Sequence, residues 1–276
     1  MTRPLIVAHR GDNAHYPENT LAAFESAMRQ GADALEMDVH LTREGELVVH
    51  HDYTLGRTVT GEGFISDYSL AELKVLDAGS WFGPAFAGER IPTLGEVMAL
   101  GRGQVRFELE LKTPTERFLE RLFAELTDYG VEDKVELTSP HLPLLARVSA
   151  LRPDLRTGIF VAPFPPWLPT ALGRAHVCDY LTLLGARVAH VPAGMLEPDF
   201  VKQFHKGRWL VHGANFQTEA ELRQAVALGM DQISTDHLSL ALRALVPHHQ
   251  HAYPPSDQGG GGILQEADRP IIERGE

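Results

Sequence analysis

Short apolar runs alternate with longer amphipathic segments along most of the chain. Strand-like runs lie at residues 4–11, 33–41, 46–52, 105–112, 134–140, 155–161, 179–185, 208–215 and 231–236. Segments with apolar positions three and four residues apart lie at 18–31, 69–79, 93–101, 115–130, 141–153, 197–207 and 217–229. Strands that alternate with helices are typical of a parallel sheet covered by helices. We therefore expect an α/β protein, a TIM (β/α)8 barrel.

Two stretches depart from this alternation. A connection at about 53–92 follows the third strand-like run and reads as a small insertion that can cover a site. Residues 247–276 are polar, aperiodic and rich in proline and glycine, so we expect a flexible C-terminal tail. The 276 residues suit one large barrel, which we place at 1–246.

Charge and cysteine content narrow the class of protein. With 25 Lys+Arg against 37 Asp+Glu, the net charge of -12 disfavours binding to nucleic acid or anionic membranes. The single cysteine, Cys178, cannot form an intrachain disulfide. We found no signal-peptide pattern and no membrane-spanning run, so we expect a cytoplasmic protein without stable membrane insertion. The sequence is also compatible with a homodimer.

Acidic residues gather at the predicted carboxyl ends of two strands, where barrel enzymes carry their sites. Residues two apart share a strand face, which pairs Glu36 with Asp38 and aligns Glu110 with Lys112. The three carboxylates would repel one another unless a divalent cation with oxygen ligands, or the charges of Arg10 and Lys112, neutralised them. We favour the cation because three acids from two strands converge.

Two histidines also end predicted strands. His9 and His51 are candidates for a general acid and a general base near neutral pH, although a single strand-end histidine is more often structural. His50 competes with His51, and strand alternation sends the two to opposite faces. Arg10 and Lys112 can hold phosphate oxygens, balance the carboxylates, or do both.

Several motifs together resemble the glycerophosphodiester phosphodiesterase family. They are 9-HRG-11, 17-PENTLAAFESAMRQGADALEMDVHLTREGELVVHHD-52, 55-LGRTVTGEG-63, 69-SLAELKVLDAG-79, 88-GERIPTLGEV-97 and 108-ELELK-112. The resemblance covers roughly residues 5 to 245. It implies a TIM barrel with a bound divalent cation that hydrolyses glycerophosphodiesters to sn-glycerol 3-phosphate and an alcohol.

The resemblance also implies roles for individual residues. The expected catalytic pair is His9 and His51, one of which deprotonates water or the glycerol 2-hydroxyl while the other protonates the leaving alcohol. The remaining roles are metal ligands for Glu36, Asp38 and Glu110, and substrate binding for Arg10, Lys112, Glu18 and Asn215. Asn19, beside Glu18, is expected to order the first loop around the site. Oxygen ligands favour Mg2+ or Ca2+, with Mn2+ as a further option.

The second half departs from the family pattern at 212-HGAN-215, where the family has Trp-Thr-Val-Asn. His212 replaces a tryptophan of the site wall and is expected either to contact substrate or to pack there. In 235-TDHL-238, Asp236 reads as a helix cap or loop hydrogen-bonder rather than a catalyst.

Two rival functions remain open from the sequence. The same machinery could act as a lysophospholipase D on lysophospholipids, which exposed aromatic residues in the connections would favour; the candidates are Trp81, Phe82, Phe86, Phe164 and Trp167. We expect ordinary loop packing for these aromatics. The other rival is a catalytically silent barrel that binds phosphodiesters.

Overall fold

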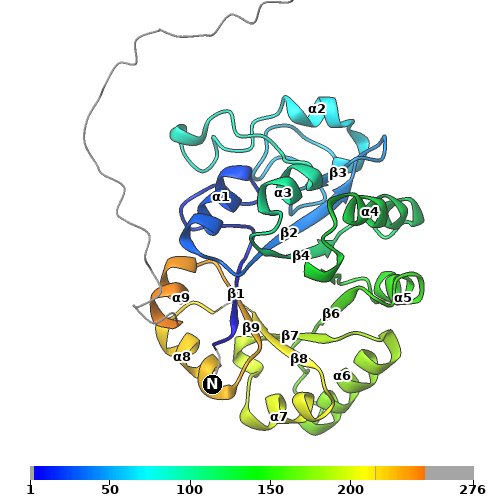
Figure 1. The fold of residues 1–276 in the computed structure, drawn as a ribbon, viewed down its shortest axis with the longest axis vertical. Coiled ribbons are helices and arrows are strands. Elements are labelled where there is room, and N and C mark those ends of the chain that lie inside the picture. Colours follow the sequence, from blue (N-terminus) through cyan, green and yellow to red (C-terminus); the bar gives the residue numbers. More distant parts are fainter. Residues whose placement is uncertain (1–2, 215, 246–276) are drawn as a thin grey trace, which may run out of the picture. The chain divides into compact units, whose positions relative to one another are not determined.

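A closed barrel of parallel strands forms the centre of the protein, for which a computed structural model describes residues 3–214 and 216–245. The barrel strands are β1 (Leu5–Ala8), β2 (Ala34–Leu41), β4 (Arg106–Leu111), β5 (Val135–Thr138), β6 (Arg156–Phe160), β7 (Val188–Pro192), β8 (Leu210–Ala214) and β9 (Gln232–Thr235). Neighbours pair in the order β1-β9-β8-β7-β6-β5-β4-β2, and β1 also pairs with β2, which closes the ring (Figure 1). The predicted TIM barrel is confirmed.

Helices surround the barrel in Figure 1. They are α1 (Leu21–Gln30), α2 (Leu70–Lys74), α3 (Leu94–Gly101), α4 (Glu116–Tyr129), α5 (Leu142–Leu151), α6 (Thr170–Leu184), α7 (Pro198–Lys206), α8 (Glu219–Leu228) and α9 (Leu238–Leu245). Threonine side chains accept backbone N–H groups at the starts of α1, α3, α4 and α8. Such caps satisfy donors that have no partner within the helix, so local residues determine where these helices begin.

The predicted strand at 179–185 is wrong, because these residues lie in α6 and in its C-cap. Val177, Leu181 and Leu184 are buried while Tyr180 and Leu183 are exposed, which is helical spacing. Gly185 ends the helix in the left-handed conformation at φ 63. The barrel strand that belongs here, β7, follows directly and was not predicted.

The predicted third strand is real but lies outside the barrel. β3 (Leu47–Val49) pairs antiparallel with β2 as a hairpin, so this strand-like run is not part of the ring of eight. After β3, the insertion, which carries α2 in Figure 1, folds over a small core of its own. This core consists of Val48, Leu55, Val59, Ile65, Leu73, Ala78 and Ile91.

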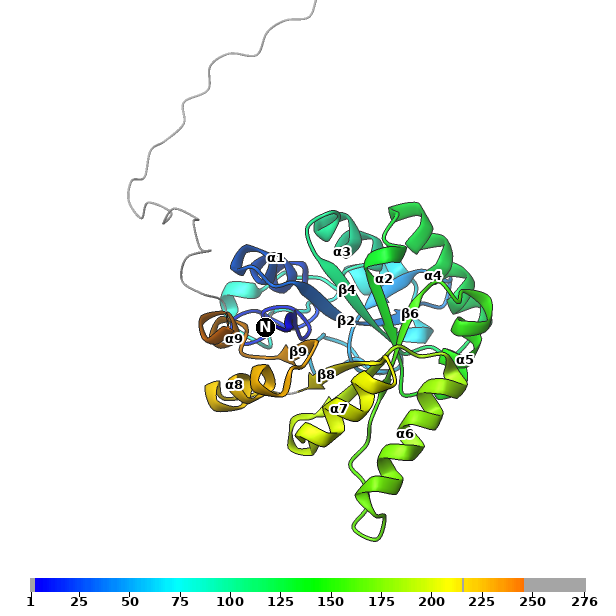
Figure 2. The ribbon, with the colours of Figure 1, turned by 60° about the horizontal axis from the view of Figure 1, so that its bottom comes forward.

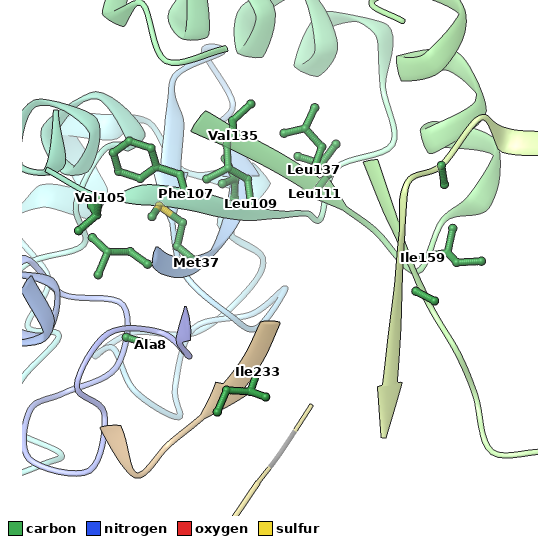
Figure 3. Packing of buried hydrophobic residues seen from close by; sticks show 14 of the residues in the cluster. Ala8, Met37, Val105, Phe107, Leu109, Leu111, Val135, Leu137, Ile159 and Ile233 are labelled. Carbon is green, nitrogen blue, oxygen red and sulfur yellow. The ribbon is translucent and has the colours of Figure 1, made fainter. Parts of the chain in front are cut away.

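The main apolar core lies between the strands and the helices. Figure 3 shows Phe107, Leu109 and Leu111 of β4 beside Val135 and Leu137 of β5, and all five are buried. Because strand residues alternate, the other face of these strands points into the barrel and carries polar side chains. The polar interior is therefore built into the period-two pattern of the strands.

Two further predictions concern the C-terminal tail and membrane insertion. The predicted tail at 247–276 lies outside the described residues. Among the helices of the described chain, none combines the length and hydropathy needed to cross a bilayer.

Candidate active site

The segment that follows β1 is held in an unusual backbone conformation. Arg10 and Asn19 have positive φ angles of 55 and 57, which non-glycine residues adopt rarely. The Arg10 N–H donates to Glu36 Oε2 at 2.9 Å, and the Asn19 N–H donates to the Arg10 carbonyl at 3.1 Å. These bonds fix the first loop against β2, as expected for Asn19.

Three carboxylates meet at the carboxyl ends of β2 and β4. Oxygen atoms of Glu36, Asp38 and Glu110 lie within 4.8 Å of one another. The Lys112 ammonium group contacts Glu110 and lies 2.9 Å from Asp38 Oδ1. The Arg10 side chain donates to Glu18 at 3.0 Å. Both cations therefore contact carboxylates of the site.

The environment separates the pKa values of the two acids on β2. Burial, and then the charge of Asp38, raise the pKa of Glu36 to about 7. Burial also acts to raise the pKa of Asp38, but the charges of Lys112 and Arg10 outweigh it and hold this pKa below its usual value. Glu36 thus keeps its proton to a higher pH than Asp38 does, which reduces the repulsion between the two carboxylates.

Each candidate catalytic histidine has a carboxylate partner. His9 Nδ1 lies 2.6 Å from Asp236 Oδ1, and His51 Nδ1 lies 2.7 Å from Asp52 Oδ1. Burial acts to lower the pKa of His9, but the hydrogen bond to Asp236 and the charge of Glu36 raise it overall. A carboxylate on Nδ1 fixes the ring orientation and leaves Nε2 for chemistry.

The position of His51 in the fold differs from the one predicted. His51 does not end a barrel strand, because β3 runs antiparallel to β2 and returns the chain beside Asp38, whose carbonyl accepts the His50 N–H at 2.9 Å. The side chain of His50 is buried, whereas that of His51 is 31% exposed. As alternation suggested, only one of the two imidazoles is accessible.

A cavity of about 230 Å³ opens at the carboxyl ends of the strands. Its lining comprises His9, Glu36, Glu108, Glu110, Phe160, Val161, His190, Pro192, Ala214 and Ser234. His212 is not part of this lining within the described chain. It is fully buried, and its ring stacks on that of His190 at 4.2 Å. Its surroundings match packing rather than substrate contact, and Asn215 lies outside the described residues.

The carboxylates fit a hard divalent cation. Asp38 Oδ1 is buried and has no hydrogen-bond partner within the described part of the chain, although the Lys112 ammonium is near. The set offers oxygen donors alone, which Mg2+ and Ca2+ prefer. The residues that would hold the ion are Glu36, Asp38 and Glu110.

Three partner residues were not assigned to the site from the sequence. Asp236 binds His9, Asp52 binds His51, and Arg57 binds both Asp52 and Glu18. Asp236 is a loop hydrogen-bonder, one of the two roles expected for it. Its place beside His9 follows from barrel closure, because Thr235 of β9 pairs with Ala8 of β1.

Comparison with known proteins identifies the family. The family model described as the glycerophosphoryl diester phosphodiesterase family matches residues 9–240. The chain belongs to this family. The membership confirms the resemblance, and with it the enzyme class expected from the sequence.

The chain is also similar to individual proteins that carry the name of this family. A glycerophosphodiester phosphodiesterase of Bacillus altitudinis is 31% identical over 86% of this chain and 96% of its own length. One from Caldanaerobacter subterraneus is 45% identical over 57% of this chain and 66% of its own length.

A phosphodiesterase structure from Oleispira antarctica, in complex with the product sn-glycerol-3-phosphate, is 29% identical with a TM-score of 0.78. It is matched over 88% of this chain and 96% of that one. Its barrel is therefore close to the one described for this chain.

Proposed function

We propose that this chain hydrolyses glycerophosphodiesters to sn-glycerol 3-phosphate and an alcohol. The observation that carries the proposal is the convergence of His9, three carboxylates and a cavity at the carboxyl ends of the barrel strands. The Oleispira relative, whose structure holds sn-glycerol-3-phosphate, supports the choice of product.

The two histidines act as acid and base on opposite steps of the reaction. Asp236 and Asp52 each accept a hydrogen bond from Nδ1, which leaves Nε2 of His9 and of His51 available to the reacting groups. The raised pKa of His9 keeps a larger fraction of its ring protonated near neutral pH. A protonated histidine can donate to the leaving alcohol, and a neutral one can accept the proton of the nucleophile.

Positive charge orients the phosphate. Arg10 lies between Glu18 and Asp38, and Lys112 lies against the carboxylates of Asp38 and Glu110. A divalent cation held by Glu36, Asp38 and Glu110 would stabilise negative charge on the phosphoryl oxygens. We propose Mg2+ or Ca2+ for this ion because every donor is oxygen.

Metal removal tests the proposal. Purified protein is incubated with glycerophosphocholine, and sn-glycerol 3-phosphate is measured with EDTA and after Mg2+, Mn2+ or Ca2+ is restored. We expect release that EDTA abolishes and at least one cation restores. Equal release with and without EDTA would contradict the role of the ion, and no release under any cation would contradict the substrate class.

A second candidate function is lysophospholipase D activity, and one observation favours it. An apolar groove of about 290 Å³ lies between the end of β6, the connection that follows and α6, a region that extends away from the barrel in Figure 2. Phe160 and Val161 line both this groove and the active-site cavity. An acyl chain in the groove would leave its phosphodiester in the cavity that His9 lines.

The aromatic candidates divide between two loops. Phe82 packs edge to face on both Trp81 and Phe86, and Phe86 packs on Tyr16 at 5.4 Å, as expected for loop packing. Phe164 instead lines the groove, and Trp167 nearby is 79% exposed. Replacing Phe164 by serine should reduce turnover of lysophosphatidylcholine and spare glycerophosphocholine. Equal losses on both substrates would count against the groove.

A further inference from the structure

A second group of metal-type ligands lies inside the barrel, separate from the three carboxylates at its mouth. Glu108 on β4, Glu136 on β5, His190 on β7 and His212 on β8 are all buried, and one ligand atom from each lies within 4.8 Å of the others. Glu108 pairs in register with Glu136, and His190 with His212. We refer to these four residues as the floor cluster.

The two acids of the floor cluster have no strong cation beside them. Among the described residues, their ion-pair partners within 4 Å are the imidazoles of His190 and His212, with no lysine or arginine. Two buried carboxylates in one site need a proton or a cation between them.

The strand next to the floor cluster has no room for a side chain at position 158. A Cβ atom at Gly158 of β6 would lie 2.6 Å from His190 Nε2 and 3.1 Å from Glu136 Oε1. Any larger residue would push the imidazole and the carboxylate apart. Glu108 and His190 also line the active-site cavity, which gives an ion a path into the interior.

We propose that the floor cluster binds a borderline transition-metal ion of the Zn2+ type. His190 Nε2 lies 2.7 Å from Glu136 Oε1, His190 Nδ1 lies 3.5 Å from Glu108 Oε1, and His212 Nδ1 lies 3.3 Å from Glu108 Oε2. Ligands at about 2.0–2.1 Å from a tetrahedral zinc ion are roughly 3.3 Å apart. The two His190 spacings use different ring nitrogens, only one of which can bind a given ion. The four ligand atoms, one from each residue, lie within 4.8 Å of one another and must approach by side-chain rotation to enclose an ion.

The donor types separate this site from the one at the mouth. Imidazole nitrogen favours Zn2+ and related ions, whereas three carboxylates favour Mg2+ or Ca2+. The competing arrangement is a metal-free hydrogen-bonded cluster, in which the Gln232 amide donates to Glu136 at 2.9 Å and lies 3.3 Å from His212 Nδ1. The experiment must distinguish these two arrangements.

The test is a zinc titration of metal-free full-length protein in excess Mg2+, followed by dialysis and measurement of zinc per chain. We expect one retained zinc ion in the wild type and in Glu36→Gln, which alters only the mouth. We expect none in His190→Gln. Circular dichroism establishes that each variant is folded, and Glu136→Gln replaces His190→Gln if the latter does not fold.

Cobalt provides a test that needs no variant. Co2+ bound by two nitrogen and two oxygen ligands in a tetrahedron absorbs much more strongly in the visible than Co2+ in a six-coordinate oxygen site. We expect the strong spectrum in wild-type protein, displaced by one equivalent of Zn2+. The proposal is overturned if the wild type retains no zinc, if His190→Gln retains it, or if Glu36→Gln loses it.

Discussion

At the scale of single residues, hydrogen bonds to carboxylates set the properties of the two histidines. Asp236 holds His9 at Nδ1. Burial acts to raise the pKa of Asp236, but the bond to His9 and the charge of that ring lower it to about 2. Asp52 likewise holds His51 at Nδ1. These carboxylates position the rings and need not touch the substrate.

The first prediction concerns Asp236→Asn. Loss of the negative partner should lower the pKa of His9, because the hydrogen bond and charge that offset its burial are gone. NMR titration of the His9 ring measures this directly. Asn13→Ala is the matched control, since Asn13 donates to the same Asp236 oxygen at 2.6 Å and leaves the carboxylate on His9 in place. An unchanged His9 pKa in Asp236→Asn would contradict the role given to this carboxylate.

The second prediction concerns the pH dependence of stability in EDTA. The pKa of Glu36 is about 7 in the fold against 4.5 for a glutamate in water, so the folded state holds a proton that the unfolded state releases. This contribution is present below about pH 4.5 and is lost as pH rises towards 7.

Glu36→Gln should remove that part of the slope, a difference of up to about 3 kcal/mol between the two ends of the window. Urea unfolding at several pH values measures it. Glu116→Gln is the control because its side chain is 85% exposed. A slope that is the same in Glu36→Gln and wild type would show that Glu36 titrates normally.

At the scale of elements, the connection from β1 to α1 holds the site residues His9 and Arg10 in a backbone conformation that tolerates little change. Gly11 has φ 84, and a Cβ there would lie 2.8 Å from the carbonyl carbon and Cβ of Ala23. A side chain would therefore push this loop away from α1. Both His9 and Arg10 directly precede this glycine.

The third prediction compares Gly11→Ala with Gly31→Ala. Gly31 also has a positive φ, 97, but an added Cβ there meets no described atom within 4 Å. We expect Gly31→Ala to cost about 1–2 kcal/mol from the backbone conformation alone. Gly11→Ala should cost a further 1–3 kcal/mol, roughly, from overpacking, and should also reduce kcat. Chemical denaturation and steady-state kinetics measure both effects, and equal stability losses would contradict the steric argument.

Sequence periodicity identified most elements but not their partners. The helical spacing of Val177, Leu181 and Leu184 is in the sequence, yet the apolar run 179–185 is short enough to resemble a strand. The antiparallel pairing of β3 does have a local signal, because the connection from Leu41 to Leu47 is too short for the crossover that parallel strands need. Partner choice is a long-range property, and short apolar runs do not encode it.

At the scale of the whole molecule, closure of the barrel assembles groups from distant parts of the chain. The rule that barrel sites lie at strand ends is enough, with the sequence, to bring His9, Glu36, Asp38 and Glu110 to one region. That rule does not reveal Asp236 beside His9, which requires β9 to meet β1. It also does not reveal the floor cluster, whose members come from four strands.

The two histidines at the barrel mouth are central to the proposed chemistry. The most direct measurement is kcat/KM for sn-glycerol 3-phosphate release from glycerophosphocholine, in wild type, His9→Ala and His51→Ala. His205→Ala is the control, because His205 lies on α7 and pairs with Asp231 at 2.8 Å, before β9 begins. We predict losses of about 100-fold or more in the first two variants and no loss in the control. Wild-type activity in either His9→Ala or His51→Ala would contradict the proposed mechanism.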